Sequence, residues 1–363
     1  MIENKKNNRN IEPGQNWEVD LFRPEDAEGV TQLFLEVYGK GYPIETYINP
    51  GKLIEENARG RTISSVTRTE HGDIVGHNAM YNSVPYEGIY ESGAGLVHKY
   101  YRGGKGIFTK MVAHGMEMAS SKFGFDGLYG ESVCNHVFSQ RLARGLGWIT
   151  QAIEVDLMPA TAYTKEKSAA GRVASLLEFL TLKPRPHRIF LPRVYEDNLR
   201  FIYSGLDDKR EIMISDESLS SSSKTEINRQ VFSFAQVARL AVMDTGDDFE
   251  SAIKNEEIAV RQQDVLVIQV WLKLSSQSVG EAVDILRSRG YFIGGVLPRW
   301  FDDDGLLMQK IFITPSWEGM QIEYERAREL LDRVRSDWAD SDKRVAKEKR
   351  GAGANGQSQT DTL

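Results

Sequence analysis

The two ends of the chain differ from its middle in their pattern of apolar and polar residues. The first sixteen residues are rich in asparagine and lysine and have almost nothing apolar to bury, which predicts a disordered leader over 1–16. Apolar residues such as Leu330 and Val334 recur at helical spacing over 319–347 and predict a C-terminal helix. The polar residues that follow predict a disordered tail over 348–363.

The first half of the chain alternates short apolar segments with amphipathic ones. Pro24, followed by Glu25 and Asp26, suits a helix start, because proline tolerates the first turn and carboxylates complement the helix dipole. The order of the elements predicts an α+β fold with a mixed, twisted sheet flanked by helices. Strands are expected at 17–22, 62–68, 74–84, 90–100, 127–133 and 148–158, and helices at 24–38, 107–122 and 137–144.

A stretch with two prolines, at 183–187, predicts a linker in the middle of the chain. We therefore expect one domain over 17–160, a helix and linker over 161–188, and a second α+β domain over 189–318. In the second domain, helices are expected at 194–206, 249–262 and 279–289, and strands at 235–243, 264–272, 291–297 and 306–312.

The composition excludes several classes of function. With 52 acidic against 45 basic residues the net charge is -7, so we expect neither nucleic acid nor a membrane as a partner. No signal peptide or run of about 18 apolar residues is present, and the six histidines lack metal-ligand spacing. The single cysteine, Cys134, cannot form an intramolecular disulfide and is expected to be a buried, inert thiol. These features predict a cytoplasmic protein without a metal.

The strand expected at 90–100 leads into a glycine-rich loop and then directly into a helix. Such a turn directs backbone N–H groups outward at the positive end of a helix, where an anion can bind. Glycines let the backbone approach a phosphate, and Arg102 and Lys105 add positive charge. A glycine-rich turn without a ligand is the alternative. The loop reads Arg102, Gly103, Gly104, Lys105, Gly106, Ile107.

This pattern resembles the GNAT N-acetyltransferase superfamily over residues 17–160. Arg23 to Asp26 looks like the start of the family's first helix, and the loop is similar to the family's Arg/Gln-x-x-Gly-x-Gly/Ala loop. Asn135 follows the fifth strand, where the family commonly has asparagine, and Gly147 with Trp148 stands where the family usually has Gly-Phe. The resemblance implies an acyl-coenzyme A-dependent N-acyltransferase, with acetyl-coenzyme A or another acyl-coenzyme A as co-substrate. The acceptor would be an amine of a small molecule or of a protein.

The resemblance also implies where the co-substrate lies. The diphosphate would bind the glycine loop, and pantetheine would lie between the fourth and fifth strands. There it would contact the backbone from Gly95 to His98, which includes Leu96 and Val97, and the side chain of Asn135. A backbone N–H in this segment would polarise the thioester carbonyl.

Two departures from the family pattern concern the loop and the general acid. The loop has one glycine more than the usual spacing, and Phe108 occupies the final Gly/Ala position. Many family members protonate the departing thiolate with a tyrosine four residues before the Gly-Phe pair, but here that position is Ala143, or Leu142 when counted from Asn135. A non-catalytic acyl-coenzyme A-binding regulator is therefore the alternative to an enzyme.

Three side chains are candidates for the base that deprotonates the amine. Glu91 ranks first and Glu131 second, because carboxylates that face the gap between the strands can act directly or through a water molecule. His98 lies close to the expected thioester and could titrate near neutral pH. Solvated strand-end glutamates and a structural histidine are the alternatives.

The second domain is expected to be a degenerate GNAT-like unit. Residues 278–292 parallel 137–148, and an apolar strand precedes both. Where the first domain has its glycine loop, the second has Asp244 to Asp248, whose three carboxylates would repel a diphosphate. We expect no cofactor there, and a role in walling the acceptor pocket or in a homo-oligomer contact. Pro298 to Phe301 predicts a strand-end turn with packed aromatics, with a ligand pocket as the alternative.

Overall fold

The computed structural model describes residues 11–39, 42, 44–104, 106–163, 171–206 and 209–355. The chain divides into two compact units, the first consisting of Met1–Ser83 and Tyr90–Leu128 and the second of Val84–Ile89 and Tyr129–Leu363. Their helices and strands confirm the predicted α+β fold class. The domain boundaries expected from the sequence stay a prediction.

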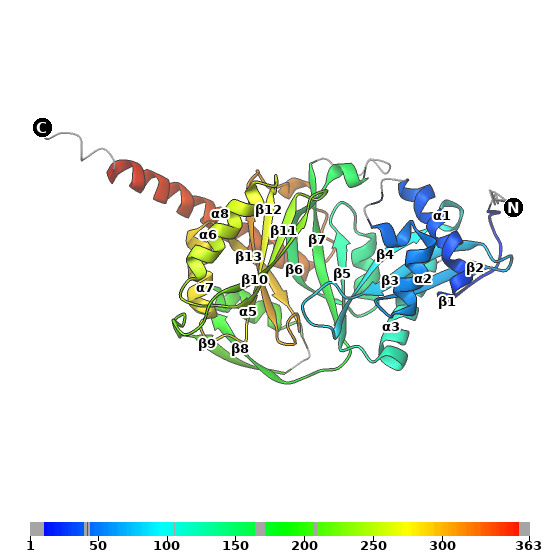
Figure 1. Cartoon of the computed structure of the whole chain (residues 1–363), viewed down its shortest axis with the longest axis horizontal. Coiled ribbons are helices and arrows are strands. Elements are labelled where there is room, and N and C mark those ends of the chain that lie inside the picture. The colour runs from blue at the N-terminus through cyan, green and yellow to red at the C-terminus, as the bar shows by residue number, and fades with distance from the viewer. Residues whose placement is uncertain are drawn as a thin grey trace, which may run out of the picture. The chain divides into compact units, whose positions relative to one another are not determined.

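Unit 1 is a four-stranded antiparallel sheet with helices on both faces (Figure 1). The strands lie in the order β1-β2-β3-β4. Its elements are β1 (Trp17–Leu21), α1 (Ala27–Tyr38), α2 (Pro50–Ala58), β2 (Thr62–Thr69), β3 (Ile74–Tyr81), β4 (Ile89–Val97) and α3 (Ile107–Met118).

Neighbouring residues of one strand supply two separate cores in unit 1. On β3, Ile74 packs with α1 and α2, whereas the next residue, Val75, packs with α3. Leu96 and Val97 divide in the same way on β4. This alternation follows from the period of two in a strand, and it explains why both faces need helical cover.

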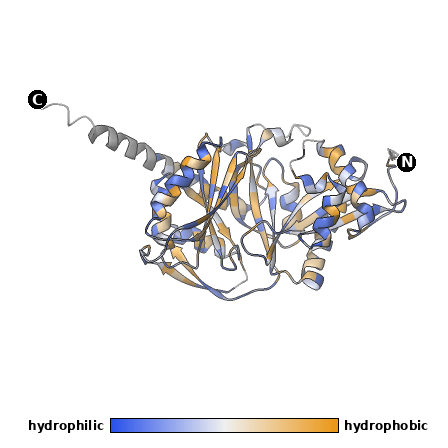
Figure 2. Cartoon of the chain, viewed as in Figure 1, coloured by the Kyte–Doolittle hydropathy of each residue, from blue (hydrophilic) through white to orange (hydrophobic). Residues whose placement is uncertain are grey.

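Unit 2 contains a large mixed sheet in the order β5-β7-β6-β13-β14-β12-β11-β10 and a separate parallel pair, β8 and β9. Figure 2 shows its strands as hydrophobic along much of their length. The strands are β5 (Gly127–Val133), β6 (Ile149–Pro159), β7 (Arg172–Thr181), β8 (His187–Pro192), β9 (Arg210–Ser215), β10 (Glu226–Phe232), β11 (Val237–Asp244), β12 (Val267–Lys273), β13 (Phe292–Leu297) and β14 (Gly305–Ile311). The helices are α4 (Phe138–Gly145), α5 (Glu196–Tyr203), α6 (Phe249–Arg261), α7 (Val279–Ser288) and α8 (Glu325–Asn355).

A strand, helix, strand, strand motif occurs twice in unit 2. In β5-α4-β6-β7 and again in β12-α7-β13-β14, the last strand lies between the other two in the sheet. The two helices also end alike: the N–H of Trp148 donates to the carbonyl of Ala143 (3.0 Å), and that of Tyr291 to Leu286 (3.0 Å). The parallel expected between 137–148 and 278–292 is thus present in the backbone hydrogen bonds.

The two copies of this motif meet where β6 pairs with β13. Gly295 lies opposite Ala152 at this junction, with a φ of 136°. A Cβ at Gly295 would lie 2.3 Å from the carbonyl oxygen of Gln151, so only glycine allows the two strands to approach this closely.

The helix expected within 161–188 is wrong, because Arg172–Thr181 forms strand β7. Val173, Ala174, Leu176 and Leu177 are all buried, so both faces of this strand are covered and its sequence is a nearly continuous apolar run. Such a run lacks the alternation that separates a strand from a buried helix. Residues 164–170 lie outside the described part of the chain.

The two ends of the chain are described only in part. Residues 1–10 of the predicted leader and 356–363 of the predicted tail lie outside the described residues. Gln15 donates to Asp73 (3.1 Å), and α8 continues past the predicted end at 347 to Asn355. Among the described helices, none combines the length and the apolar character needed to cross a membrane.

Candidate functional site

The glycine loop of unit 1 connects β4 to α3 and has an open backbone. Gly103, Gly104 and Gly106 have φ values of 76°, 79° and 67°, in the left-handed region that favours glycine. Apart from its chain neighbours, a Cβ added at any of them would meet no atom of the described residues within 4 Å, so the loop is open on this side. Gly106 is also the residue that precedes the first turn of α3.

The N–H groups of this loop are available for an anion. Within the described part of the chain, the backbone N–H groups of Gly103, Gly104 and Gly106 donate to no other group. Ile107 begins a helix of 12 residues, whose positive end faces the same loop. Unpaired donors and a helix N-terminus together form a cradle suited to a diphosphate.

Of the two basic residues of the loop, Arg102 is the one that the structure describes. The Nε atom of Arg102 donates to the carbonyl of Val97 (2.7 Å), which holds the exposed guanidinium beside the loop. Lys105 lies outside the described residues. Phe108 lies against β4, because a Cβ at Gly95 would be 2.3 Å from its ring.

The strand before the loop contains a β-bulge. His77 pairs with Leu96, and Ala79 pairs with Gly93, so Asn78 alone faces both Ala94 and Gly95. Ala94 has a φ of 49°, which costs a residue with a Cβ on the order of 1 kcal/mol. The side chains of Leu96 and Val97 pack into the two cores, which leaves the backbone of this segment as the part that a ligand could contact.

Glu91 is held at the start of β4 by two hydroxyl groups. Tyr81 Oη donates to its Oε1 (2.7 Å), and Ser83 Oγ donates to its Oε2 (2.8 Å). The hydrogen-bonded pair lies over Gly93, where a Cβ would be 2.5 Å from Tyr81 Oη and 3.0 Å from Glu91 Oε1. These two hydroxyl donors fix the orientation of the Glu91 carboxyl group beside the bulge.

His98 faces α1 and not the glycine loop. Its side chain is 6% exposed, and its Nε2 lies 3.5 Å from Glu36 Oε2 on α1. Burial lowers the pKa of His98, against the opposing effect of Glu36. The backbone N–H of His98 donates to Val75 (2.8 Å), so this residue fixes the end of β4 to β3.

Glu131 and Asn135, the other predicted site residues, belong to unit 2. Glu131 Oε1 accepts a hydrogen bond from Arg239 on β11 (3.0 Å), and Arg239 also contacts the buried Glu154 (3.1 Å). The carbonyl of Asn135 accepts from Gln321 Nε2 (3.1 Å).

Cys134, next to Asn135, is buried, and burial raises the pKa of its thiol to about 12. A thiol with so high a pKa is protonated at neutral pH, as expected for an inert cysteine.

The acidic turn of unit 2, at Asp244 to Asp248, is already filled by its own chain. The N–H of Thr245 donates to Asp244 Oδ1 (2.8 Å), that of Gly246 to Thr225 Oγ1 (3.1 Å) and that of Asp247 to the carbonyl of Ser220 (3.0 Å). A Cβ at Gly246 would lie 2.2 Å from the carbonyl oxygen of Ser223. Three consecutive N–H groups of this turn are thus already paired, and Ser223 fills the space beside Gly246 that a diphosphate would need.

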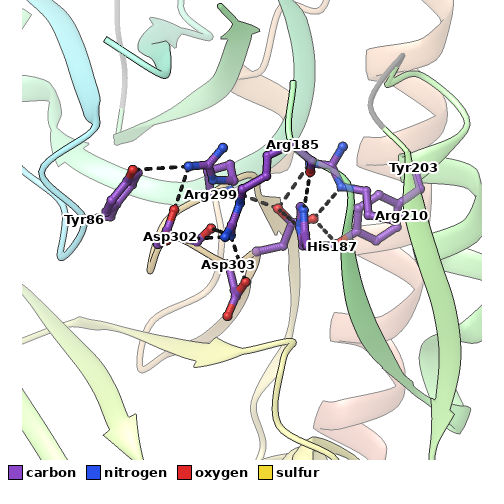
Figure 3. A network of polar contacts seen from close by, with 9 residues as sticks. Tyr86, Arg185, His187, Tyr203, Arg210, Arg299, Asp302 and Asp303 are labelled. Atoms are coloured by element: carbon purple, nitrogen blue, oxygen red, sulfur yellow. Dashed lines mark hydrogen bonds and ion pairs between the residues drawn. The ribbon is translucent and has the colours of Figure 1, made fainter. Parts of the chain in front are cut away.

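A buried polar network in unit 2, which the sequence did not reveal, includes His187, Tyr203 and Arg210 (Figure 3). These residues converge on Asp304. Asp304 is 0% exposed and accepts from Arg210 Nε (2.8 Å), Tyr203 Oη (2.8 Å) and the N–H of Arg299 (2.9 Å), with His187 Nε2 at 3.2 Å. These contacts hold the pKa of Asp304 far below its usual range, despite its burial, and raise that of His187. All the residues named here belong to unit 2, which indicates a structural role for the network.

The aromatic residues after β13 are also structural. Trp300 is 2% exposed, and its ring packs against those of Tyr129 and Trp271, with centroid distances of 4.9 and 5.1 Å. Arg299 contacts Tyr86 Oη (3.2 Å) and Asp302 Oδ1 (2.6 Å). The predicted turn with packed aromatics is confirmed.

Sequence reasoning missed the residues that hold the site of unit 1 from β3. His77, Asn78 and Tyr81 contact the bulge or Glu91, yet none of them was singled out. The available signal was the pair of polar residues at 77 and 78 in an otherwise apolar strand. Among the described residues, no three His, Cys, Asp or Glu side chains form a group that could hold a metal ion.

No family model and no curated protein matches the chain. Among solved structures, it is similar to an N-acetyltransferase from Staphylococcus aureus Mu50, at 16% identity over 46% of this chain and 99% of that chain, with a TM-score of 0.39. It is likewise similar to yncA of Salmonella typhimurium, solved with its cofactor acetyl-CoA, at 16% identity over 47% and 96%, with a TM-score of 0.38. A third is ribosomal-protein-alanine N-acetyltransferase from Brucella melitensis, at 18% identity over 46% and 99%, with a TM-score of 0.38.

Proposed function

We propose that this protein binds an acyl-coenzyme A on the glycine loop of unit 1 and transfers the acyl group to an amine. The observation that carries the proposal is the open loop itself. Among the described residues, the N–H groups of Gly103, Gly104 and Gly106 at the start of α3 have no partner, and no atom lies where a side chain would be. A diphosphate matches these donors in charge and in size.

The residues present fit a coenzyme A thioester at two further points. Arg102 adds a positive charge beside the loop, where the diphosphate would bind. The bulge at Ala94 and Gly95 leaves β4 with one more residue than β3 across the same step. An irregular strand of this kind can offer its backbone to a ligand instead of to its neighbour.

Glu91 is the residue that we assign to proton removal. In the proposed reaction the amine nitrogen attacks the thioester carbonyl carbon, the C–N bond forms, the C–S bond breaks and the thiolate leaves. The proton released by the amine passes to the carboxylate of Glu91, directly or through water. The hydroxyls of Tyr81 and Ser83 hold this carboxyl group in one orientation before the reaction.

A non-catalytic acyl-coenzyme A-binding regulator is the second candidate, and one observation favours it. The α4 position where a tyrosine would protonate the thiolate is occupied by Ala143, whose carbonyl accepts the N–H of Trp148. The two candidates share the binding site and differ in turnover. Release of free coenzyme A in the presence of amines distinguishes them.

We further propose a small-molecule or protein amine as the acceptor and the cytoplasm as the setting, as the composition suggests. The motif β12-α7-β13-β14 of unit 2 supports the hypothesis that the second half derives from a repeat of the first. Its acidic turn, filled by Thr225 and Ser220, supports the expectation that it holds no coenzyme A.

Calorimetric titration with acetyl-coenzyme A tests the proposal. We expect Gly104→Glu to weaken binding at least about 100-fold, because the new carboxylate occupies the phosphate position and repels it. The matched control is Gly72→Glu, which places the same charge at a glycine with a φ of 82° and no atom within 4 Å of its Cβ. Absence of binding to the unaltered protein, or equal losses in the two variants, would contradict the proposed site.

A further inference from the structure

Ala94, the residue of the β4 bulge with a left-handed backbone, is hydrogen-bonded to a buried histidine of the neighbouring strand β3. His77 is 0% exposed, and its Nδ1 lies 2.9 Å from the carbonyl oxygen of Ala94. Its Nε2 lies 3.0 Å from Ser64 Oγ on β2. The ring is enclosed by Phe34 and Tyr47, with ring centroids 5.3 and 5.4 Å away.

These partners fix the tautomer of His77. A carbonyl oxygen can only accept, so Nδ1 carries the hydrogen and donates it to Ala94. Nε2 is then the acceptor for the hydroxyl of Ser64. Burial lowers the pKa of His77 to about 4, which keeps the ring neutral and this arrangement intact at neutral pH.

The bond from His77 acts on a peptide unit with two functional ends. The carbonyl of Ala94 and the N–H of Gly95 belong to the same amide, so a donor on the carbonyl polarises the amide and strengthens its N–H as a donor. Gly95 is the first residue of the segment where the thioester is expected. An alanine at a φ of 49° keeps its conformation only if its surroundings enforce it.

We infer that His77 is a positioning residue for acyl transfer, which holds the Ala94–Gly95 peptide in the orientation that presents the Gly95 N–H to the thioester oxygen. This inference rests on the proposed function. Asn78 supports the same element, since its Nδ2 donates to Ser92 Oγ (3.1 Å) and a Cβ at Gly95 would lie 2.9 Å from its Oδ1. The side chains of β3 thus set the backbone of β4.

Two substitutions of His77 separate positioning from packing. His77→Asn places an amide nitrogen where Nδ1 now donates to Ala94, whereas His77→Gln places the amide nearer to Nε2 and Ser64. Both remove the imidazole from the aromatic enclosure. We expect His77→Gln to lower kcat about 10- to 100-fold with the KM for acetyl-coenzyme A changed less than about 3-fold. His77→Asn should retain kcat within about 5-fold.

A second substitution tests the strain. Glycine adopts the left-handed conformation without a Cβ penalty, so Ala94→Gly in the His77→Gln background should restore part of the lost kcat, by about 5-fold or more. Equal losses of kcat in the Asn and Gln variants, or no restoration by Ala94→Gly, would overturn the inference.

Amide hydrogen exchange of the ligand-free protein gives a readout that does not depend on turnover. Peptides covering 92–98 should exchange faster in His77→Gln than in His77→Asn, while peptides of β1 are unchanged. Equal exchange in the two variants would contradict the role of the Nδ1 bond. If the unaltered protein binds no acetyl-coenzyme A, the proposed function fails, whereas equal exchange with intact binding removes only the role of His77.

Discussion

Both units contain a strand that runs through a turn into a helix, and the two turns use their backbone N–H groups in opposite ways. After β4, the N–H groups of the glycines at 103, 104 and 106 have no partner, and no atom lies within 4 Å of an added Cβ, within the part of the chain that the structure describes. After β11, Asp244, Thr225 and Ser220 accept the corresponding donors, and the chain itself covers Gly246. A strand-to-helix turn is therefore a binding site only where the chain does not satisfy it first.

The largest expected effect separates the two turns by stability. Gly246→Ala places a Cβ 2.2 Å from the carbonyl of Ser223, so we expect the free energy of unfolding to fall by about 3 kcal/mol or more. Gly104→Ala meets no atom and should cost only about 1 to 2 kcal/mol, from its left-handed φ. Urea denaturation of both variants measures the difference, and equal losses would refute the distinction between a filled and an open turn.

Buried titratable groups give the units opposite responses to pH. Burial lowers the pKa of His77 in unit 1 to about 4. The free energy of unfolding of unit 1 should therefore fall by about 3 kcal/mol as the pH falls from 6.5 through 4, because only the unfolded chain binds the proton in this range. Glu178 in unit 2 is buried beside Ser132 and Thr150, and burial raises its pKa to about 7. Glu178 contributes about 3 kcal/mol to the free energy of unfolding below pH 4.5, and this contribution is lost as the pH rises through 7.

These two effects can be measured by hydrogen exchange in peptides of β3 and β7 between pH 4.5 and 8, corrected for intrinsic rates. The slope of protection against pH should be positive in β3 and negative in β7. Glu178→Gln should abolish the slope in β7 and leave that in β3 unchanged. His77→Asn should do the reverse. Slopes of the same sign in both strands would disprove the assignment.

The next effect concerns the hydroxyl that closes the acidic turn. Thr225→Val removes the acceptor for the N–H of Gly246 and should lower the free energy of unfolding by about 1 to 2 kcal/mol. Thr225→Ser retains the hydroxyl and serves as the control. Calorimetry should show the same affinity for acetyl-coenzyme A in both variants. A loss of binding in Thr225→Val would indicate that coenzyme A binds at the acidic turn of unit 2 and would contradict a site in unit 1.

The smallest effect is the charge beside the glycine loop. Arg102→Gln should weaken acetyl-coenzyme A binding about 5-fold, and the difference should shrink at high salt, because the exposed guanidinium is screened. Lys224→Gln removes a cation beside Asp247 and Asp248 in the acidic turn and should leave the Kd unchanged. A salt-independent difference would assign Arg102 a role in holding the loop through Val97.

The sequence predicted those parts of the molecule whose physical causes are local. The α+β class and the glycine loop follow from periodicity and from residues that tolerate a positive φ. Strand β7 was mistaken for a helix, because burial of both faces removed its alternation. The hold of Tyr81 and Ser83 on Glu91 and the network at Asp304 depend on which strands pair, which no local pattern records.

In unit 2, strands β6 and β13 pair through a single residue pair, Gly295 with Ala152. The two copies of the repeated motif are fused there, because backbone meets backbone where a side chain would otherwise stand. Side chains elsewhere in either copy of the motif can vary without disturbing this junction. This position cannot, since any side chain would push the two copies apart. The pairing of β6 with β13 therefore depends on a position that has no side chain.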